Sequence, residues 1–138
     1  MIRRFIMALA MISLALGVTA CQPHPFTATV LRPPKPIADF SMAASDGSQF
    51  TLSQHQDRLV ILFFGYTNCP DVCPLTLAQL KLAGEALGAD VGRVQVAFVT
   101  VDPNRDSLNK LKSYLDNFNP AFIGLRTDDE AALKEVGG

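Results

Sequence analysis

The 138-residue sequence has no tryptophan, two tyrosines, two histidines and three cysteines. Its basic residues are not in excess either, because 12 lysines and arginines stand against 13 acidic residues, for a formal charge of -1. A chain without a basic stripe lacks the electrostatic footprint of a nucleic-acid-binding protein, so we exclude nucleic acid as a partner. The length, with 49% hydrophobic residues and no internal repeat, has room for one small domain.

The longest apolar run, Phe5 to Val18, is too short to span a bilayer comfortably, which takes roughly 20 residues. Two arginines precede this run, and small residues follow it as far as Cys21. This layout is typical of a secretory signal, so we expect residues 1–20 to be a signal peptide. A plain signal peptide or an uncleaved anchor are the alternatives to the lipoprotein type considered next.

The stretch Val18-Thr19-Ala20-Cys21 resembles the lipobox of bacterial lipoproteins. The resemblance implies that Cys21 is lipidated and becomes the first residue of the mature chain. We therefore expect an extracytoplasmic protein, periplasmic or on the cell surface, anchored to a bacterial membrane by lipid. Residues 21–36 are polar and rich in proline, which predicts an extended tether containing a solvated His24.

Residues 37–138 carry the pattern of a folded α/β domain in which apolar runs alternate with helical periodicity. The expected strands are 49–52, which follows a turn at 45–48, then 59–64, 94–101 and, more weakly, 121–125. A first helix has Leu77, Leu80, Gly84 and Leu87 on its inner face and ends at Gly88. A second helix has Leu108, Leu111 and Leu115 on its inner face and Asp106 or Ser107 as its cap, and a final helix begins at 128. The runs at 59–64 and 94–101 predict central strands that are buried on both faces.

Strand, helix and strand in this order predict a βαβ unit with parallel strands and a right-handed crossover. Both strands then end at the same edge of the sheet, where ligands of open α/β sheets bind. The loop after Phe64 and the loop after Val101 should therefore face one site.

Two cysteines, Cys69 and Cys73, follow the first of these strands in the stretch "NCPDVCP". At a strand-to-helix junction the free N–H groups and the helix dipole favour a thiolate. Pro74 suits the first turn of the following helix, so we expect Cys73 at or beside the N-cap. The three intervening residues allow a structural disulfide, thiol–disulfide exchange or a shared metal ion.

Soft thiolates favour Cu(I), whereas a structural zinc site would need four ligands. His24 lies in the tether, and we expect His55 to be a solvent-facing loop residue rather than a ligand. Phe64 and Tyr66 are expected to pack under the cysteine loop, and Arg105 to form an ion pair. Phe118 and Phe122 are expected in the core.

The stretches "FFGYTNCPDVCPLTL" and "VTVDPNRDSLNKLKSYLDNFNPAFIGL" closely resemble the SCO1/SenC family of copper chaperones, from about Ile37 to the end of the chain. The resemblance implies a thioredoxin-like fold and a role in assembling the binuclear copper centre, CuA, in subunit II of cytochrome c oxidase. Carried over by position, Cys69 and Cys73 would be the copper-binding, redox-active residues. Asp71 would shape the motif, and Asp102 would lie beside the site.

One feature departs from the family, whose members use a distal histidine as a third copper ligand. The sequence ends at "ALKEVGG", and no residue in it matches that histidine. We therefore expect a fold that is incomplete at its C-terminus, in a piece of a longer protein rather than a genuine short variant, which would leave an unpaired sheet edge. Cu(I) is the expected ligand, with Cu(II) only in a full-length form. A thiol–disulfide oxidoreductase is the main alternative, and no recognisable peroxide-reducing pattern supports a peroxidase.

Overall fold

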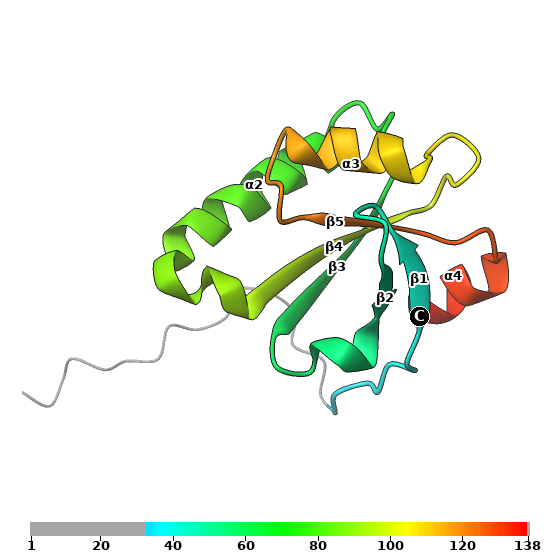
Figure 1. Ribbon diagram of the computed structural model, residues 1–138, viewed down its shortest axis with the longest axis horizontal. Coiled ribbons are helices and arrows are strands. Elements are labelled where there is room, and N and C mark those ends of the chain that lie inside the picture. The colour runs from blue at the N-terminus through cyan, green and yellow to red at the C-terminus, as the bar shows by residue number, and fades with distance from the viewer. Residues whose placement is uncertain (1–32, 138) are drawn as a thin grey trace, which may run out of the picture. The chain divides into compact units, whose positions relative to one another are not determined.

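The computed structural model describes residues 33–137, and its folded unit begins at Ile37. The predicted signal peptide, Cys21 and His24 lie outside the described residues. The elements are β1 (Ser41–Ala44), β2 (Gln49–Thr51), the 3₁₀ helix η1 (Leu52–His55), β3 (Leu59–Gly65), α2 (Val72–Leu87), the 3₁₀ helix η2 (Gly88–Arg93), β4 (Val94–Thr100), α3 (Leu108–Asp116), β5 (Ile123–Arg126) and α4 (Glu130–Gly137) (Figure 1).

The strands form one five-stranded sheet in the order β2-β1-β5-β4-β3. Strands β3, β4 and β5 run parallel, whereas β1 is antiparallel to both β5 and β2. The predicted βαβ unit is present, because α2 connects β3 to its parallel neighbour β4. The register pairs Gly65 with Thr100, so both strands end at the same edge of the sheet.

Helices α2 and α3 lie on one side of the sheet, and α4 lies on the other (Figure 1). The buried residues on the α2 and α3 side are Leu77, Val96, Phe98, Leu111, Leu115 and Phe122. Those on the α4 side are Met42, Ala44, Phe50, Ala97, Val99, Leu125 and Val136. Alternate residues of β4 thus enter opposite cores, which confirms that this strand is buried on both faces.

The prediction that β3 is a central strand is wrong for the described residues, in which β3 pairs only with β4 and lies at the edge of the sheet. Its side chains from Val60 to Phe64 are half-buried. Ile61 and Phe63 pack on the α2 side, while Val60 and Leu62 pack on the α4 side. An apolar run predicts that both faces of a strand are covered, but it does not predict which strands pair with it. The pattern therefore could not predict the position of β3 in the strand order.

The N-cap of α2 differs from the prediction, whereas one of the two residues predicted to cap α3 is confirmed. Helix α2 begins at Val72 with Asp71 as its N-cap, which makes Cys73 the second helical residue. The N-cap of α3 is Ser107, whose hydroxyl accepts a hydrogen bond from the N–H of Lys110. Asp106 therefore does not cap α3. Among residues 33–137, no helix combines the length and hydropathy needed to cross a bilayer.

Candidate functional site

The two predicted cysteines come together where β3 passes into α2. Cys69 lies in the connecting loop and is partly exposed, whereas Cys73 is buried in the first turn of the helix. The backbone N–H of Cys73 donates a hydrogen bond to the Cys69 sulfur at 3.4 Å. This N–H is one of the groups that a helix start leaves without an internal acceptor, so the Cys69 sulfur occupies a position that favours negative charge. Both thiols are free.

The two thiols are inequivalent. Hydrogen bonds from the Cys73 thiol and backbone N–H lower the pKa of Cys69 below its ordinary value, with smaller contributions from the Asp71 N–H and the Tyr66 hydroxyl. Burial raises the pKa of Cys73, and its hydrogen bond to Cys69 raises it further. Cys69 is therefore the sulfur that is more readily a thiolate, and Cys73 is the sulfur shielded from solvent.

Gly65, the last residue of β3, makes room for the buried sulfur. A Cβ atom at this position would lie 2.8 Å from the Phe98 ring and 3.0 Å from the Cys73 sulfur, both too close for ordinary contact. Only glycine therefore lets the helix bring Cys73 against the end of the strand.

The loop after β4 lies against the cysteine loop, as the parallel register requires. The N–H of Val101 donates to the carbonyl of Gly65 at 2.9 Å. Asp106, on this second loop, is 1% exposed, and its carboxylate accepts from the Thr67 N–H at 2.9 Å and from the Thr67 hydroxyl at 2.5 Å. It also accepts from the Thr100 hydroxyl at 2.8 Å and from the Lys110 ammonium at 3.4 Å. From the sequence, Asp106 was predicted only as a candidate cap of the following helix.

The two other predicted site residues use their carboxylates differently. The Asp102 carboxylate pairs with the Arg105 guanidinium at 2.5 Å, which is the ion pair expected for Arg105. Asp71 is exposed, and its side chain makes no capping hydrogen bond. Its backbone, rather than its carboxylate, acts on Cys69. The structure places both residues at the cysteine edge of the sheet, and their roles in the site stay predictions.

Two tyrosine side chains, Tyr66 and Tyr114, border the site. The Tyr114 ring packs edge-on against Phe98 and Phe118, at centroid distances of 6.0 Å and 5.4 Å. Burial, followed by the nearby charges of Cys73, Cys69 and Asp106, raises the pKa of Tyr114 to about 12. Among the described residues, no group hydrogen-bonds its buried hydroxyl. Tyr66 was expected only to pack, yet its hydroxyl helps to lower the pKa of Cys69.

A third metal ligand is absent from the part of the chain that the structure describes. No group of three or more histidine, cysteine, aspartate or glutamate side chains within residues 33–137 could hold a metal ion. His55 belongs to η1 and stacks on Phe50 with ring centroids 4.3 Å apart, so it is not the loop residue that was expected. Within the described residues, the candidate metal ligands are therefore the two sulfurs of Cys69 and Cys73.

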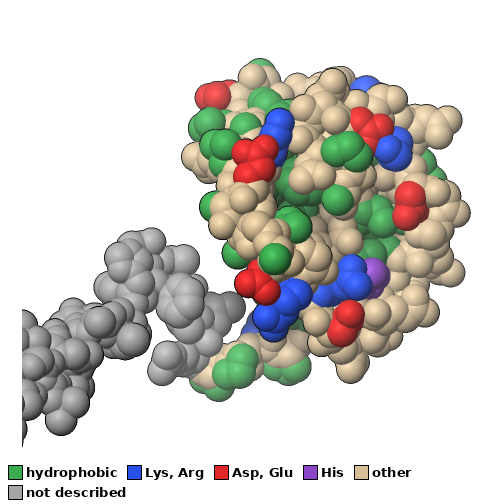
Figure 2. Space-filling view, turned by 60° about the vertical axis from the view of Figure 1, so that its left-hand side comes forward, with side chains coloured by type: hydrophobic (Ala, Val, Ile, Leu, Met, Phe, Trp, Pro, Cys, Tyr) green, Lys and Arg blue, Asp and Glu red, His purple; other side chains and the backbone are tan. Residues whose placement is uncertain are grey.

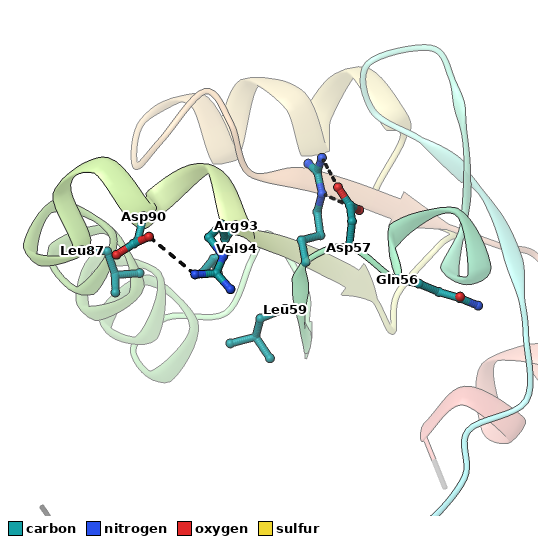
Figure 3. Close-up of a pocket in the computed structure, with 8 residues that line it drawn as sticks. Gln56, Asp57, Leu59, Leu87, Asp90, Arg93 and Val94 are labelled. Atoms are coloured by element: carbon teal, nitrogen blue, oxygen red, sulfur yellow. Dashed lines mark hydrogen bonds and ion pairs between the residues drawn. The ribbon is translucent and has the colours of Figure 1, made fainter. Parts of the chain in front are cut away.

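Two hollows lie near the amino ends of β3 and β4, at the end of the sheet away from the cysteines. An open pocket of about 420 Å³ contains Leu59, Leu87 and the ion pairs Asp57–Arg58 and Asp90–Arg93 (Figure 3). An apolar groove of about 290 Å³ lies beside it, and hydrophobic side chains gather in a hollow of the face seen in Figure 2. Neither lining contains a cysteine or a histidine, so neither offers a thiolate or an imidazole ligand.

Comparison with known proteins gives consistent matches. The sequence model of the SCO1/SenC family matches residues 29–137. An SCO2-like protein of Rickettsia conorii is 33% identical over 139 residues, covering 91% of this chain and 66% of the relative. Apo Sco1 of Thermus thermophilus has a TM-score of 0.72 and 48% identity, with 80% of this chain and 63% of that chain covered. Yeast Sco1 solved with copper bound has a TM-score of 0.66 and 38% identity, with 75% and 69% covered.

These neighbours confirm the thioredoxin-like α/β fold, and copper is bound in a solved relative, as the resemblance implied. The chain spans slightly less than two thirds of the length of the relatives from Rickettsia and Thermus.

Proposed function

Because this chain belongs to the SCO1/SenC family, we propose that it binds copper through Cys69 and Cys73 and delivers it to the CuA centre in subunit II of cytochrome c oxidase. The observation that carries the proposal is the sulfur pair at the start of α2, in which a helical N–H already donates to the Cys69 sulfur at 3.4 Å. Copper bound to yeast Sco1, a relative with the same fold, supports the choice of metal.

The pair suits Cu(I) for reasons of ligand type and number. Thiolates are soft ligands, and two of them satisfy a monovalent copper ion better than they satisfy zinc, which takes four ligands. The lowered pKa of Cys69 makes this sulfur a thiolate at lower pH than an ordinary cysteine. The raised pKa of Cys73 means that its proton must be displaced when copper binds, so loading releases protons. Binding of Cu(II) is proposed only for a form that supplies a third ligand.

Release of copper follows from the unequal exposure of the two sulfurs. Cys69 is partly exposed and Cys73 is buried, so a partner's thiolate reaches copper from the side of Cys69. Ligand exchange then replaces Cys69 first and Cys73 second, and copper is never free in solution. Delivery requires the protein and its partner to share a compartment. We propose an extracytoplasmic location with a lipid at Cys21, a proposal supported by the N-terminal sequence pattern alone.

A second candidate function, thiol–disulfide exchange, is favoured by the same difference in pKa. The Cys69 thiolate would attack a disulfide of the partner and form a mixed disulfide, releasing one partner thiolate. Cys73 would then attack Cys69, leaving a Cys69–Cys73 disulfide and a second reduced partner thiol. Two electrons pass from the pair to the partner, so the protein must be reduced again after each turnover.

Titration of the reduced chain with Cu(I) under anaerobic conditions, against a chromophoric chelator, tests the copper proposal. We expect one Cu(I) per chain, and we expect Cys69→Ser to weaken binding at least 100-fold because a hydroxyl is a poor Cu(I) ligand. Cys21→Ser is the matched control, since it removes a cysteine that is not in the pair, and it should leave binding unchanged. Full binding by Cys69→Ser would refute the proposal. Reduction of a model disulfide without copper binding would favour the second function.

A further inference from the structure

We propose that Asp106 is a positioning residue that holds Cys69 and Cys73 close enough to act as a pair. Its effect on copper rests on the proposed function, whereas its effect on the two thiols does not. Asp106 touches neither sulfur, and it acts through Thr67 in the cysteine loop.

The carboxylate of Asp106 is nearly inaccessible and fully engaged. It is 1% exposed and accepts four hydrogen bonds, two from Thr67, one from Thr100 and one from Lys110. A buried carboxylate is costly unless it is satisfied in this way. The hydrogen bonds outweigh burial and keep the pKa of Asp106 below its ordinary value, so the group is a carboxylate at neutral pH.

The contacts of Asp106 reach the cysteine loop over a long sequence distance. Thr67 lies 39 residues earlier in the chain, and both its N–H and its hydroxyl are held. Asn68, the residue after Thr67, is also held in place, because the Lys110 ammonium contacts its side chain at 3.3 Å. Immediately before Thr67, the carbonyl of Tyr66 accepts from the Cys69 N–H at 3.2 Å. Asp106 on the second loop and Lys110 in the first turn of α3 therefore hold Thr67 and Asn68, the two residues that precede Cys69.

Capping of α3 does not account for Asp106, since Ser107 performs that role. The same helix provides a natural comparison in Asp116, which pairs with Lys112 at the same i,i+4 spacing as Asp106 with Lys110. The Asp116 side chain is 40% exposed, whereas that of Asp106 is 1% exposed. Asp106 thus differs from an ordinary helical ion pair in burial and in its contact with Thr67.

The decisive experiment measures the pairing of the thiols in the full chain. The reduced chain is equilibrated with glutathione and glutathione disulfide; the cysteine pair gives up two electrons and two protons, and one glutathione disulfide becomes two thiols. Asp106→Asn keeps the volume but places an amide N–H against the Thr67 donors. We expect its equilibrium constant for forming the Cys69–Cys73 disulfide to fall about tenfold, because the sulfurs are held less closely. Asp116→Asn, the matched control, should stay within twofold of the parent.

Cu(I) affinity is measured on the same variants and should fall in parallel. Thr67→Ser, which keeps the hydroxyl, should behave as the parent, whereas Thr67→Val should show part of the loss. If Asp106→Asn fails to fold, Thr67→Val carries the test. A lower unfolding midpoint with an unchanged or increased disulfide equilibrium constant would overturn the inference, since the role would then be structural only. If the parent chain binds no Cu(I), the proposed function fails, and the glutathione measurement still decides the role of Asp106.

Discussion

The two ends of strands β3 and β4 use charge in opposite ways. At the carboxyl end, the Asp106 carboxylate is 1% exposed and is hydrogen-bonded to backbone and side-chain donors of another loop. At the amino end, Asp57 pairs with Arg58 at 3.4 Å and Asp90 pairs with Arg93 at 3.7 Å, while both carboxylates are 71% exposed (Figure 3). Exposed pairs contribute about 0–1 kcal/mol, so the buried carboxylate at the carboxyl end holds the backbone more strongly than the ion pairs at the amino end do.

This difference indicates that the candidate site lies at the carboxyl end of the two strands. Backbone N–H groups at the start of α2 and a buried carboxylate converge near the cysteines, whereas the amino end has a pocket with exposed charges and apolar walls. A carboxyl edge is also where ligands of parallel sheets bind, because helix starts gather there.

Alanine substitutions of a glycine at each end of the strands should differ most in their effect on the free energy of unfolding. Gly65→Ala places a Cβ atom 2.8 Å from Phe98 and 3.0 Å from the Cys73 sulfur, so we expect a loss of about 1–3 kcal/mol in the free energy of unfolding. Gly92→Ala, near the amino end, meets no atom within 4 Å and should change stability by less than about 0.5 kcal/mol. Urea denaturation of both variants measures the difference, and equal losses would contradict it.

Acid should remove the contribution of Asp106 to stability. The pKa of Asp106 in the folded protein lies below its unfolded value of about 3.9, so its stabilisation is present above that pH and is lost as pH falls through the folded value. At pH 7 we expect Asp106→Asn to be about 1–3 kcal/mol less stable than the parent. Denaturation curves from pH 7 down to about pH 2 should show this gap closing. A gap independent of pH would argue against a charged Asp106.

The smallest change in the free energy of unfolding is expected when an exposed ion pair at the amino end is removed. Asp90→Asn removes the partner of Arg93, but both side chains are more than two-thirds exposed. We expect a change of at most about 0.5 kcal/mol in the free energy of unfolding, and less in high salt. The same denaturation series at low and high salt measures it. A loss as large as that of Asp106→Asn would remove the distinction between the two ends.

Local patterns in the sequence predicted most of the elements near the site. The apolar run before Gly65 and the glycine at position 88, with its φ of +55°, marked the end of β3 and the end of α2. The βαβ order then placed the loop of Cys69 beside the loop of Asp102. The strand β1 was missed because its four residues alternate between exposed and buried positions over too short a length to show a period.

By itself, the sequence determined that Cys69 and Cys73 stand at a strand-to-helix junction, because spacing and periodicity are local properties of the chain. The tertiary structure alone decided that β3 lies at the edge among the described strands. It also decided that Cys73 is buried against Gly65 and that Asp106 reaches Thr67 across 39 residues. Lateral strand order, burial of a single sulfur and a hydrogen bond between distant loops depend on how the whole chain packs, and no short stretch of residues encodes them.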